Sequence, residues 1–276
     1  MKKITIVRAD GAEDIWNPRK LERSLKCAGA SSSTASTITK EIERDIVSGM
    51  TTADIYRRAF SFLKKQECPA AARYSIKQAI MAMGPTGYPF EQLLGRLLAA
   101  EGYTVSFPDS VRGRCVSHEV DVVAAKDGRK IMVEAKFHNQ PGFRSDVKTA
   151  LYVRARYEDL AAASGWNEGW LITNTKFTSD AIRYGSCAGL HLLGWGYPAG
   201  GGLESLLTAY HLWPITILTT LSTREKRLLM EKNIVVCRDL IDRPSVLKFA
   251  DVSDSKAAAV ISEVKKIIAS ASSTVK

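Results

Sequence analysis

Three residues that could do chemistry lie between positions 118 and 136: Asp121, Glu134 and Lys136. Apolar runs flank the dipeptide Asp127-Gly128, which is typical of a two-residue hairpin turn. We therefore expect two antiparallel strands, with a carboxylate on the first and a carboxylate and an amine on the second. Two carboxylates can bind a divalent metal, and a lysine can stabilise negative charge that develops on a reacting group.

Alternation along each strand brings these side chains onto common faces. Glu134 and Lys136 share a face because they are two residues apart, and Asp121 shares a face with Glu119 and Val123. The apolar composition of the strands predicts burial, and a buried carboxylate without a partner is costly. We expect Mg²⁺ or Mn²⁺ to compensate the charge. The alternative is a solvated Glu–Lys pair on an exposed sheet face, which has little energetic value.

A helix is predicted from Phe90 to Ala100, ahead of the hairpin. Its leucines recur at helical spacing and form one apolar stripe. Glu91 lies at the flank of this stripe, turned partly inward. The alternative for Glu91 is a first-turn acid that is favoured only by the helix dipole. Gly102 is expected to end the helix in a left-handed conformation, and residues 103–107 to form the next strand.

The order of these features resembles the PD-(D/E)xK restriction-endonuclease-like fold, and more narrowly its Mrr-type branch. The resemblance covers about residues 85 to 197, with Phe-Glu at 90–91, Gly-Tyr at 102–103 and Glu-Ala-Lys at 134–136. It implies a metal-dependent DNA endonuclease. It also implies that Asp121 and Glu134 hold the metal, that Lys136 lies beside the attacking water and scissile phosphate, and that Glu91 is an accessory catalytic acid.

A second helix is predicted after the hairpin, from Ser145 as its N-cap to about Ala163. On this helix Lys148, Tyr152 and Arg156 recur every four residues and form one basic face that includes an aromatic ring. Such a face can lie along a DNA phosphate backbone. The alternative is a solvated charged face without a partner.

Short apolar strands alternate with helices through the residues that follow. Strands are expected at 170–173 and 190–195, with a helix between them at 178–187. Together with the hairpin and the flanking helices, this alternation predicts an α/β fold in which helices cover one sheet.

The composition bounds the class of protein. The chain has 276 residues, enough for two or three domains, and a formal net charge of +10 that suits a polyanion such as DNA. It has no apolar run long enough for a membrane helix and no signal-peptide core near its start. Five scattered cysteines without a C-x-x-C pair argue against a zinc ribbon or disulfide framework and indicate a cytoplasmic protein.

The first 84 residues are predicted to be mainly helical. A strand at 4–8 precedes helices that begin near residues 18, 34, 51 and 69, the last of which runs to residue 84. Asn17 is expected to cap the first helix, with Pro18 as its first residue, and Thr51 with Asp54 approaches a capping box.

These residues resemble the ATP-cone, a regulatory nucleotide-binding domain best known at the start of ribonucleotide reductases. The matching segments are Ile-Thr-Ile-Val-Arg-Ala-Asp-Gly at 4–11, Asn-Pro-Arg-Lys-Leu at 17–21, an altered form of a spaced Ile-Thr-x-x-Ile-Tyr pattern at 50–56, and Ala-Ala-Arg-Tyr at 71–74. The resemblance implies ATP or dATP as an effector, with contacts from Val7, Arg8, Lys20 and Arg23. Nucleotide hydrolysis is not expected, since there is no P-loop sequence. The alternative is a small helical bundle with a basic surface.

A glycine run at 200–202 marks the last boundary, and residues 203–276 are expected to form a small helical domain. Parts of it resemble a helix-hairpin-helix module, in which Ser222 and Ser253 cap helices and Asn233 takes the left-handed position often held by glycine. In that family the hairpin backbone binds phosphate. The alternatives are a domain that only packs together or one that mediates dimerisation.

The sequence therefore predicts an ATP-cone-like domain at 1–84, an Mrr-type nuclease domain at 85–199 and a helical domain at 203–276. The expected activity is metal-dependent DNA cleavage regulated by ATP or dATP, with a role in defence or DNA processing in a prokaryote. We expect a homodimer that does not associate with membranes. The alternative from another class is a catalytically inactive, nucleotide-responsive DNA-binding or assembly protein.

Overall fold

The structure is a computed structural model that describes residues 4–9, 11–140, 142–163 and 165–272, so Asp10 of the predicted N-terminal motif lies outside the described residues. Internal contacts divide the chain into two compact units. The first combines residues 1–79, 215–229 and 237–276, and the second combines residues 80–214 and 230–236. Within the described part of the chain, no helix has the length and apolarity needed to cross a membrane. The predicted domain boundaries at 84, 199 and 203 stay a prediction.

The second unit is built on a five-stranded mixed sheet. Its strands lie in the order β11, β9, β7, β6, β3. β11, β9 and β7 run parallel, whereas β6 and β3 each run antiparallel to their neighbours. The bounds, in sheet order, are His191–Leu193, Glu168–Thr173, Arg129–Lys136, Val122–Lys126 and Thr104–Ser106. With its helices, this sheet forms the mixed α/β core expected of a restriction-endonuclease-like domain.

The β6–β7 hairpin turns at the predicted dipeptide. Asp127 and Gly128 both have positive φ, 51° and 77°, which a type I′ turn requires at both central positions. The predicted first strand is shorter than expected, because β6 begins at Val122. Asp121, just before it, accepts the backbone N–H of Ala135 through its carboxylate at 2.7 Å, in place of a strand carbonyl.

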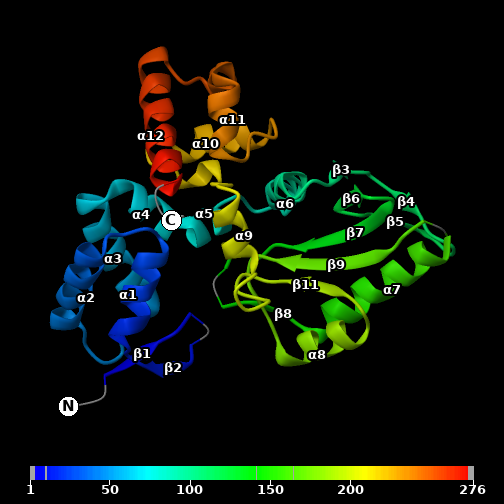
Figure 1. The fold of residues 1–276 in the computed structure, drawn as a ribbon, viewed down its shortest axis with the longest axis horizontal. Helices are drawn as coiled ribbons and strands as arrows, with labels where there is room; N and C mark the ends of the chain where they lie inside the picture. Colours follow the sequence, from blue (N-terminus) through cyan, green and yellow to red (C-terminus); the bar gives the residue numbers. More distant parts are fainter. Residues whose placement is uncertain (1–3, 10, 141, 164, 273–276) are drawn as a thin grey trace. The chain divides into compact units, whose positions relative to one another are not determined.

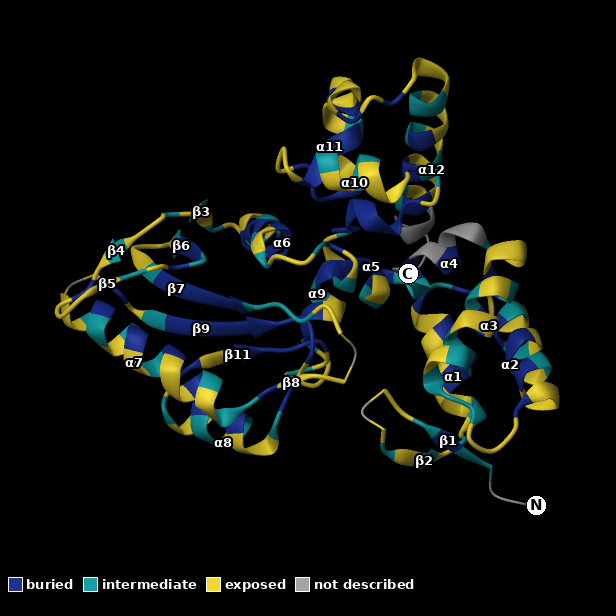
Figure 2. Ribbon diagram, turned by 180° about the vertical axis from the view of Figure 1, so that it is seen from behind, coloured by how far each residue is buried: buried dark blue, intermediate teal, exposed yellow. Residues whose placement is uncertain are grey.

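Helices lie on both faces of the sheet (Figure 1). α6 (Tyr88–Ala100) covers one face and ends before Gly102, whose φ of +89° is the predicted left-handed conformation. α7 (Val147–Ala163) and α8 (Ser179–Cys187) lie on the other face. The central strands β7 and β9 are buried along almost their whole length, and α7 exposes its outer face (Figure 2).

The predicted start of α7 is wrong by one residue. Ser145 belongs to a short strand, β8 (Arg144–Ser145), which pairs with β10 (Lys176–Phe177). Asp146 is the capping residue instead, because its Oδ1 accepts the backbone N–H of Thr149 at 3.0 Å. The remaining short strands of this unit, β4 (Val111–Arg112) and β5 (Ser117–His118), form a hairpin of their own.

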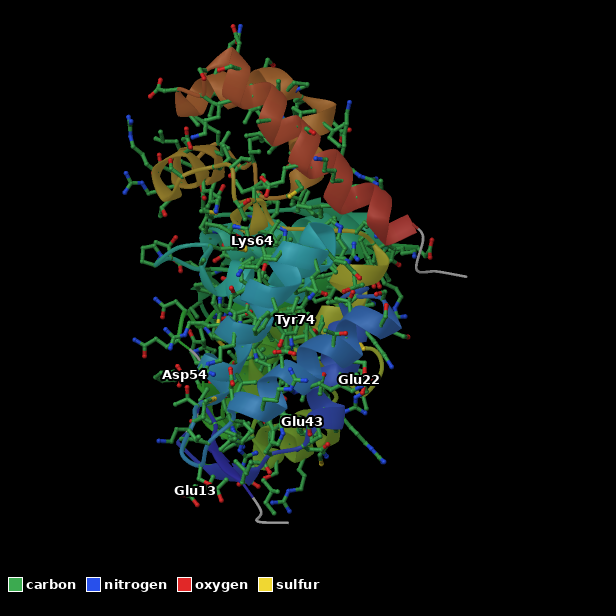
Figure 3. The ribbon with its side chains drawn as sticks, turned by 90° about the vertical axis from the view of Figure 1, so that its left-hand side faces the viewer. Glu13, Glu22, Glu43, Asp54, Lys64 and Tyr74 are labelled. Atoms are coloured by element: carbon green, nitrogen blue, oxygen red, sulfur yellow. The ribbon has the colours of Figure 1, made fainter. Side chains whose placement is uncertain are left out.

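The N-terminal part of the first unit has a two-stranded sheet and a helical bundle. Asn17 caps the first helix and Pro18 is its first residue, as predicted. Thr51 and Asp54 form the capping box of another helix. Asp54 is labelled in Figure 3. The predicted last helix is instead two helices that break at Ser75. The elements are β1 (Thr5–Val7), β2 (Glu13–Ile15), α1 (Pro18–Cys27), α2 (Ser32–Asp45), α3 (Thr52–Gln66), α4 (Cys68–Tyr74) and α5 (Ile76–Met81), the last of which crosses the boundary after residue 79.

The C-terminal segment is helical, as expected. Ser222 and Ser253 accept backbone N–H groups at the starts of two helices, and Asn233 has a φ of +58°. Within the first unit the last helix, α12, packs against α4, and Thr216 Oγ1 donates to the carbonyl of Ala79 at 2.6 Å. The elements are α9 (Leu203–Ala209), η1 (Ile215–Ile217), α10 (Thr223–Met230), α11 (Cys237–Asp242), η2 (Pro244–Ala250) and α12 (Asp254–Ser272).

Candidate active site

The hairpin brings the two predicted carboxylates to neighbouring positions. Val122 pairs with Val133 across the hairpin, so Asp121 falls opposite Glu134. Asp121 is fixed by its bond to the N–H of Ala135, next in sequence to Glu134. Glu134 is only 2% exposed. The two acids predicted to hold a metal are therefore adjacent at the end of the sheet.

Two cations bind the buried carboxylate of Glu134. Lys136 Nζ lies 2.6 Å from Oε1, and Arg156 Nη1 lies 2.6 Å from Oε2. The side chain of Lys136 is 37% exposed, whereas that of Arg156 is 9% exposed. Charge-assisted hydrogen bonds of this length offset the cost of burying the carboxylate. Lys136 is therefore accessible to a ligand from solvent, whereas Arg156 is buried on the other side of the carboxylate.

The position of Arg156 corrects the predicted DNA-binding face. Lys148 and Tyr152 are exposed on α7, as expected, but Arg156 is buried on the inner side of the helix. Eight residues advance about 80° beyond two full turns, so the third member of an i, i+4, i+8 series rotates away from the first. Arg156 thereby joins the buried stripe that contains Val153 and Leu160.

Glu91 lies in the first turn of α6 and belongs to the same charge cluster. A Cβ added at Gly87 would lie 3.2 Å from its Oε1 and 3.8 Å from Cβ of Phe137, which follows Lys136. Burial raises the pKa of Glu91 to about 7, with further increases from the negative charges of Asp121 and Glu134. The protonation of the predicted accessory acid therefore depends on the charges of both carboxylates.

The carboxylates fit the oxygen donors that Mg²⁺ or Mn²⁺ prefers. Burial, and then the charge of Glu134, also raise the pKa of Asp121, so a cation would relieve a charge that is costly in the folded chain. Among the residues that the structure describes, no three His, Cys, Asp or Glu side chains form a metal cage. Asp121 and Glu134 could hold an ion that completes its shell with water and substrate oxygens, as Mg²⁺ commonly does.

A polar cluster that the sequence analysis missed fixes the chain just beyond Lys136. Asn174, at the end of β9, accepts the backbone N–H of His138 at 2.9 Å and donates to its carbonyl at 2.8 Å. Thr173 Oγ1 donates to the carbonyl of Lys136 at 2.8 Å. The sequence pattern that could have revealed this cluster is the polar Thr-Asn-Thr at 173–175. It comes at the end of a buried parallel strand, where α/β sheets commonly bind ligands.

His118 does not join the carboxylates in the site. Its Nε2 hydrogen-bonds to Asp159 Oδ2 at 2.9 Å. Asp159 also accepts the backbone N–H of Cys115 at 2.8 Å and that of Val116 at 3.3 Å. His118 is thus part of a contact between the β4–β5 hairpin and α7.

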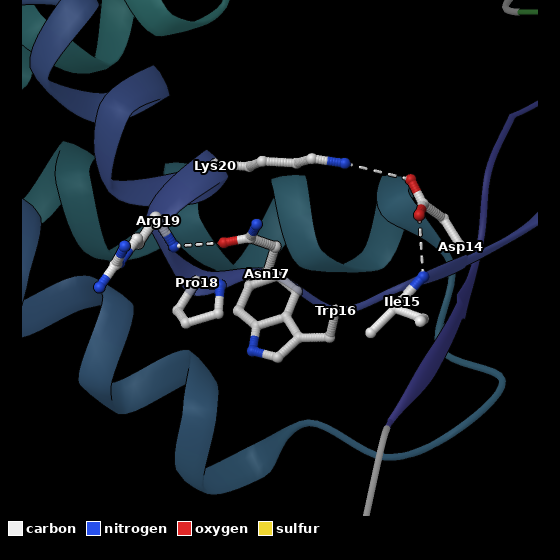
Figure 4. Close-up of a pocket in the computed structure, with 7 residues that line it drawn as sticks. All are labelled: Asp14, Ile15, Trp16, Asn17, Pro18, Arg19 and Lys20. Carbon is white, nitrogen blue, oxygen red and sulfur yellow. Dashed lines mark hydrogen bonds and ion pairs between the residues drawn. The ribbon is translucent and has the colours of Figure 1, made fainter.

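The predicted nucleotide contacts lie in the first unit, at the end of β1, directly after it and on α1. Lys20 Nζ pairs with Asp14 Oδ2 at 3.3 Å and, with Asp14, lines a surface pocket of 490 Å³ (Figure 4). Arg8 and Arg23 are exposed and Val7 is half-buried in β1. Trp16 also lines this pocket. Its indole N–H is buried and has no acceptor among the described residues.

Comparisons with known proteins place the site within a matched domain. Residues 83–194 match the restriction endonuclease family Mrr_cat, and residues 213–268 match the family described as AF1548-like, C-terminal. An uncharacterized protein of Archaeoglobus fulgidus is 40% identical over an alignment of 179 residues that covers 63% of this chain and 99% of the relative.

A solved structure is also similar to this chain. The crystal structure of the protein of unknown function AF1548 is 38% identical, with a TM-score of 0.59 over 67% of this chain and 99% of that chain. The restriction-endonuclease match supports a nuclease. The chain belongs to the AF1548-like family and carries a restriction-endonuclease domain over residues 83–194.

Proposed function

We propose that this protein is a metal-dependent DNA endonuclease that hydrolyses phosphodiester bonds. The observation that carries the proposal is the convergence of Asp121, Glu134 and Lys136 at one end of the sheet, with Lys136 Nζ 2.6 Å from Glu134 Oε1. The restriction-endonuclease match over the same residues supports this reaction class.

Each side chain has a role that follows from its surroundings. Mg²⁺ or Mn²⁺ held by Asp121 and Glu134 would polarise a phosphoryl oxygen and lower the pKa of a bound water. Lys136, the partly exposed cation, stabilises negative charge on the phosphate. Arg156 is a positioning residue that fixes the carboxylate of Glu134. Glu91, with a pKa of about 7, exchanges a proton near neutral pH and serves as the accessory acid.

We further propose that ATP or dATP binds the first unit and regulates cleavage. Arg8, Lys20 and Arg23 supply cations for phosphates, and Asp14 holds Lys20 until a nucleotide competes for it. The indole ring of Trp16 lines the same pocket. Equilibrium dialysis with ATP and dATP tests this directly, and we expect Lys20→Ala together with Arg23→Ala to abolish retention of both nucleotides.

Plasmid cleavage with Mg²⁺ or Mn²⁺, with and without ATP or dATP, tests the nuclease proposal. We expect Glu134→Gln and Lys136→Ala each to lower the cleavage rate by about a hundredfold or more, as loss of a charge-stabilising group commonly does. Lys130→Ala is the matched control, because Lys130 lies on the same strand at its other end, with Nζ 4.1 Å from the ring centre of Trp166. Lys130→Ala should cut normally.

The rival function is an inactive, nucleotide-responsive DNA-binding or assembly protein. It would be favoured if wild-type protein cut no plasmid, branched or single-stranded DNA with either metal, yet bound DNA equally well with and without it. Light scattering with and without dATP would then report whether nucleotide sets the oligomeric state, for which we expect a dimer.

A further inference from the structure

Three aromatic side chains that are exposed to solvent lie on segments that carry or adjoin residues of the candidate site. Tyr88 is 44% exposed, Phe143 55% and Tyr152 57%. Large aromatic rings usually bury most of their surface when no partner requires them outside. We call Tyr88, Phe143 and Tyr152 the aromatic rim.

Tyr152 is linked to the buried cation of the site. The guanidinium carbon of Arg156 lies 5.4 Å from the centre of the Tyr152 ring, one helical turn away. Arg156 in turn binds Glu134 at 2.6 Å. Arg156 therefore connects the Tyr152 ring to the carboxylate of Glu134, and the ring is more than half exposed to solvent.

Phe143 and Tyr88 are linked to other parts of the site. The Phe143 ring stacks on His138 with centroids 5.7 Å apart and planes inclined by 13°. Asn174 fixes the backbone of His138, two residues beyond Lys136. Tyr88 is the first residue of α6, three residues before Glu91, and follows Gly87, where an added Cβ would lie 3.8 Å from Cβ of Phe137.

Cationic side chains accompany the rim. Arg144, next to Phe143, lies opposite Lys176 in the β8–β10 pair, and both are exposed. Lys148 is exposed one turn before Tyr152 on α7. Exposed aromatic rings interleaved with cations are the surface that single-stranded nucleic acid requires, since bases stack on the rings and phosphates meet the cations.

We propose that the aromatic rim stacks unpaired bases, so that the protein binds and cuts DNA whose bases are unstacked or single-stranded beside the scissile phosphate. This inference rests on the proposed nuclease function and names its substrate class. Fully paired duplex keeps its bases stacked on each other and offers the rim no base face, whereas a bubble or single-stranded arm does.

Fluorescence anisotropy in EDTA tests the inference without cleavage, using the full chain and three labelled DNAs of equal length and phosphate count. These are a blunt duplex, a duplex with a central bubble of unpaired bases, and the same bubble with abasic sites. Stacking predicts that the wild type binds the bubble about tenfold more tightly than the duplex. The abasic bubble should bind like the duplex, because it keeps the backbone but lacks bases.

The variants separate stacking from folding and from charge. Phe143→Ala with Tyr152→Ala should bring the bubble-to-duplex affinity ratio close to one, whereas Tyr152→Phe should preserve it. Leu151→Ala is the matched control, because Leu151 is 46% exposed, is next to Tyr152 in sequence and has no aromatic ring on which a base could stack. It should leave the ratio unchanged.

Two results would overturn the inference while the nuclease proposal stands: a wild-type ratio near one, or a ratio that the double substitution leaves unchanged. Tight binding to the abasic bubble would also overturn it, since backbone flexibility rather than stacking would then explain the preference. If the wild type bound none of the DNAs in EDTA and cut none of them with Mg²⁺ or Mn²⁺, the nuclease proposal itself would fail together with the inference.

Discussion

Arg156 Nη1 lies 2.6 Å from Glu134 Oε2, and the two side chains, 9% and 3% exposed, form a buried ion pair. The pair joins the middle of α7 to the end of β7. Lys136 occupies the other oxygen of the same carboxylate, so one buried acid orders a helix, a strand and a solvent-facing amine together. This arrangement makes the stability of the domain and the geometry of the site depend on the same carboxylate.

The first prediction concerns the loss of this buried cation. Arg156→Met should lower the free energy of unfolding by about 3 to 5 kcal/mol, because Glu134 would keep its buried charge with one partner fewer. Urea denaturation measures the change. Adding Glu134→Gln to the Arg156→Met variant should recover part of the loss.

The exposed pair of Arg183 with Asp180 is the control, since the Arg183 side chain is 80% exposed. Arg183→Met should cost less than about 1 kcal/mol. Equal losses at the two arginines would contradict the buried-pair account.

The second prediction is a pH dependence of stability at Glu91. Its pKa rises from 4.5 to about 7 on folding, so the folded chain holds this proton more tightly than the unfolded chain. The contribution of Glu91 to stability therefore falls as pH rises from about 4.5 to 7. Glu91→Gln should be more stable than wild type at pH 8, on the order of 1 kcal/mol after allowance for partial exposure.

At pH 5 the two proteins should differ little in urea denaturation, because wild-type Glu91 is then mostly protonated in the folded state. Glu43→Gln, at an exposed site on α2, should show no such difference between the two pH values. A larger gain for Glu91→Gln at pH 5 than at pH 8 would reverse the sign and refute the argument.

The third prediction concerns metal binding in the absence of DNA. Mg²⁺ or Mn²⁺ should raise the Tm of the wild type, because an ion bound only by the folded state adds about 2.7 kcal/mol at a hundred times its Kd. Asp121→Asn and Glu134→Gln should each reduce the shift in differential scanning fluorimetry. Glu158→Gln, at an exposed position on α7, should shift like the wild type. A shift that survives both site substitutions would place the ion elsewhere.

The fourth prediction concerns Asn174. Asn174→Ala removes two hydrogen bonds to the backbone of His138, each contributing about 1 kcal/mol, and should lower stability by roughly 2 kcal/mol. The loosened strand end should also slow single-turnover cleavage while DNA affinity stays close to that of the wild type. Thr208→Ala removes an exposed hydrogen bond from the hydroxyl to the carbonyl of Glu204 on α9. It should neither lower stability by this amount nor slow cleavage. Weakened DNA binding with unchanged cleavage would assign Asn174 to recognition instead.

Local signals account for the part of the site that the sequence predicts. The Asp127-Gly128 turn and the alternation of β7 place Glu134 and Lys136 on one face, and the register then brings Asp121 opposite Glu134. These relationships span a few residues and depend on backbone geometry alone. They are therefore accessible without knowledge of the tertiary fold.

Long-range contacts decide what the sequence could not predict. The spacing of Lys148, Tyr152 and Arg156 is compatible with one face, but the neighbouring sheet determines that Arg156 points inward to Glu134. At the start of α7, Ser145 and Asp146 both have side chains suited to capping. The pairing of Ser145 with Phe177 in β8–β10 removes it from that role.

The first unit combines chain segments from before and after the nuclease domain, with α12 packed against α4 and Thr216 bonded to Ala79. Ribosomes synthesise these segments in order, so the early bundle emerges long before the helix that covers it. The intervening domain has all of its own sheet by Leu193 and can fold meanwhile. A polypeptide truncated after residue 214 would thus contain all five strands of the sheet, whereas its bundle would still lack the last helix.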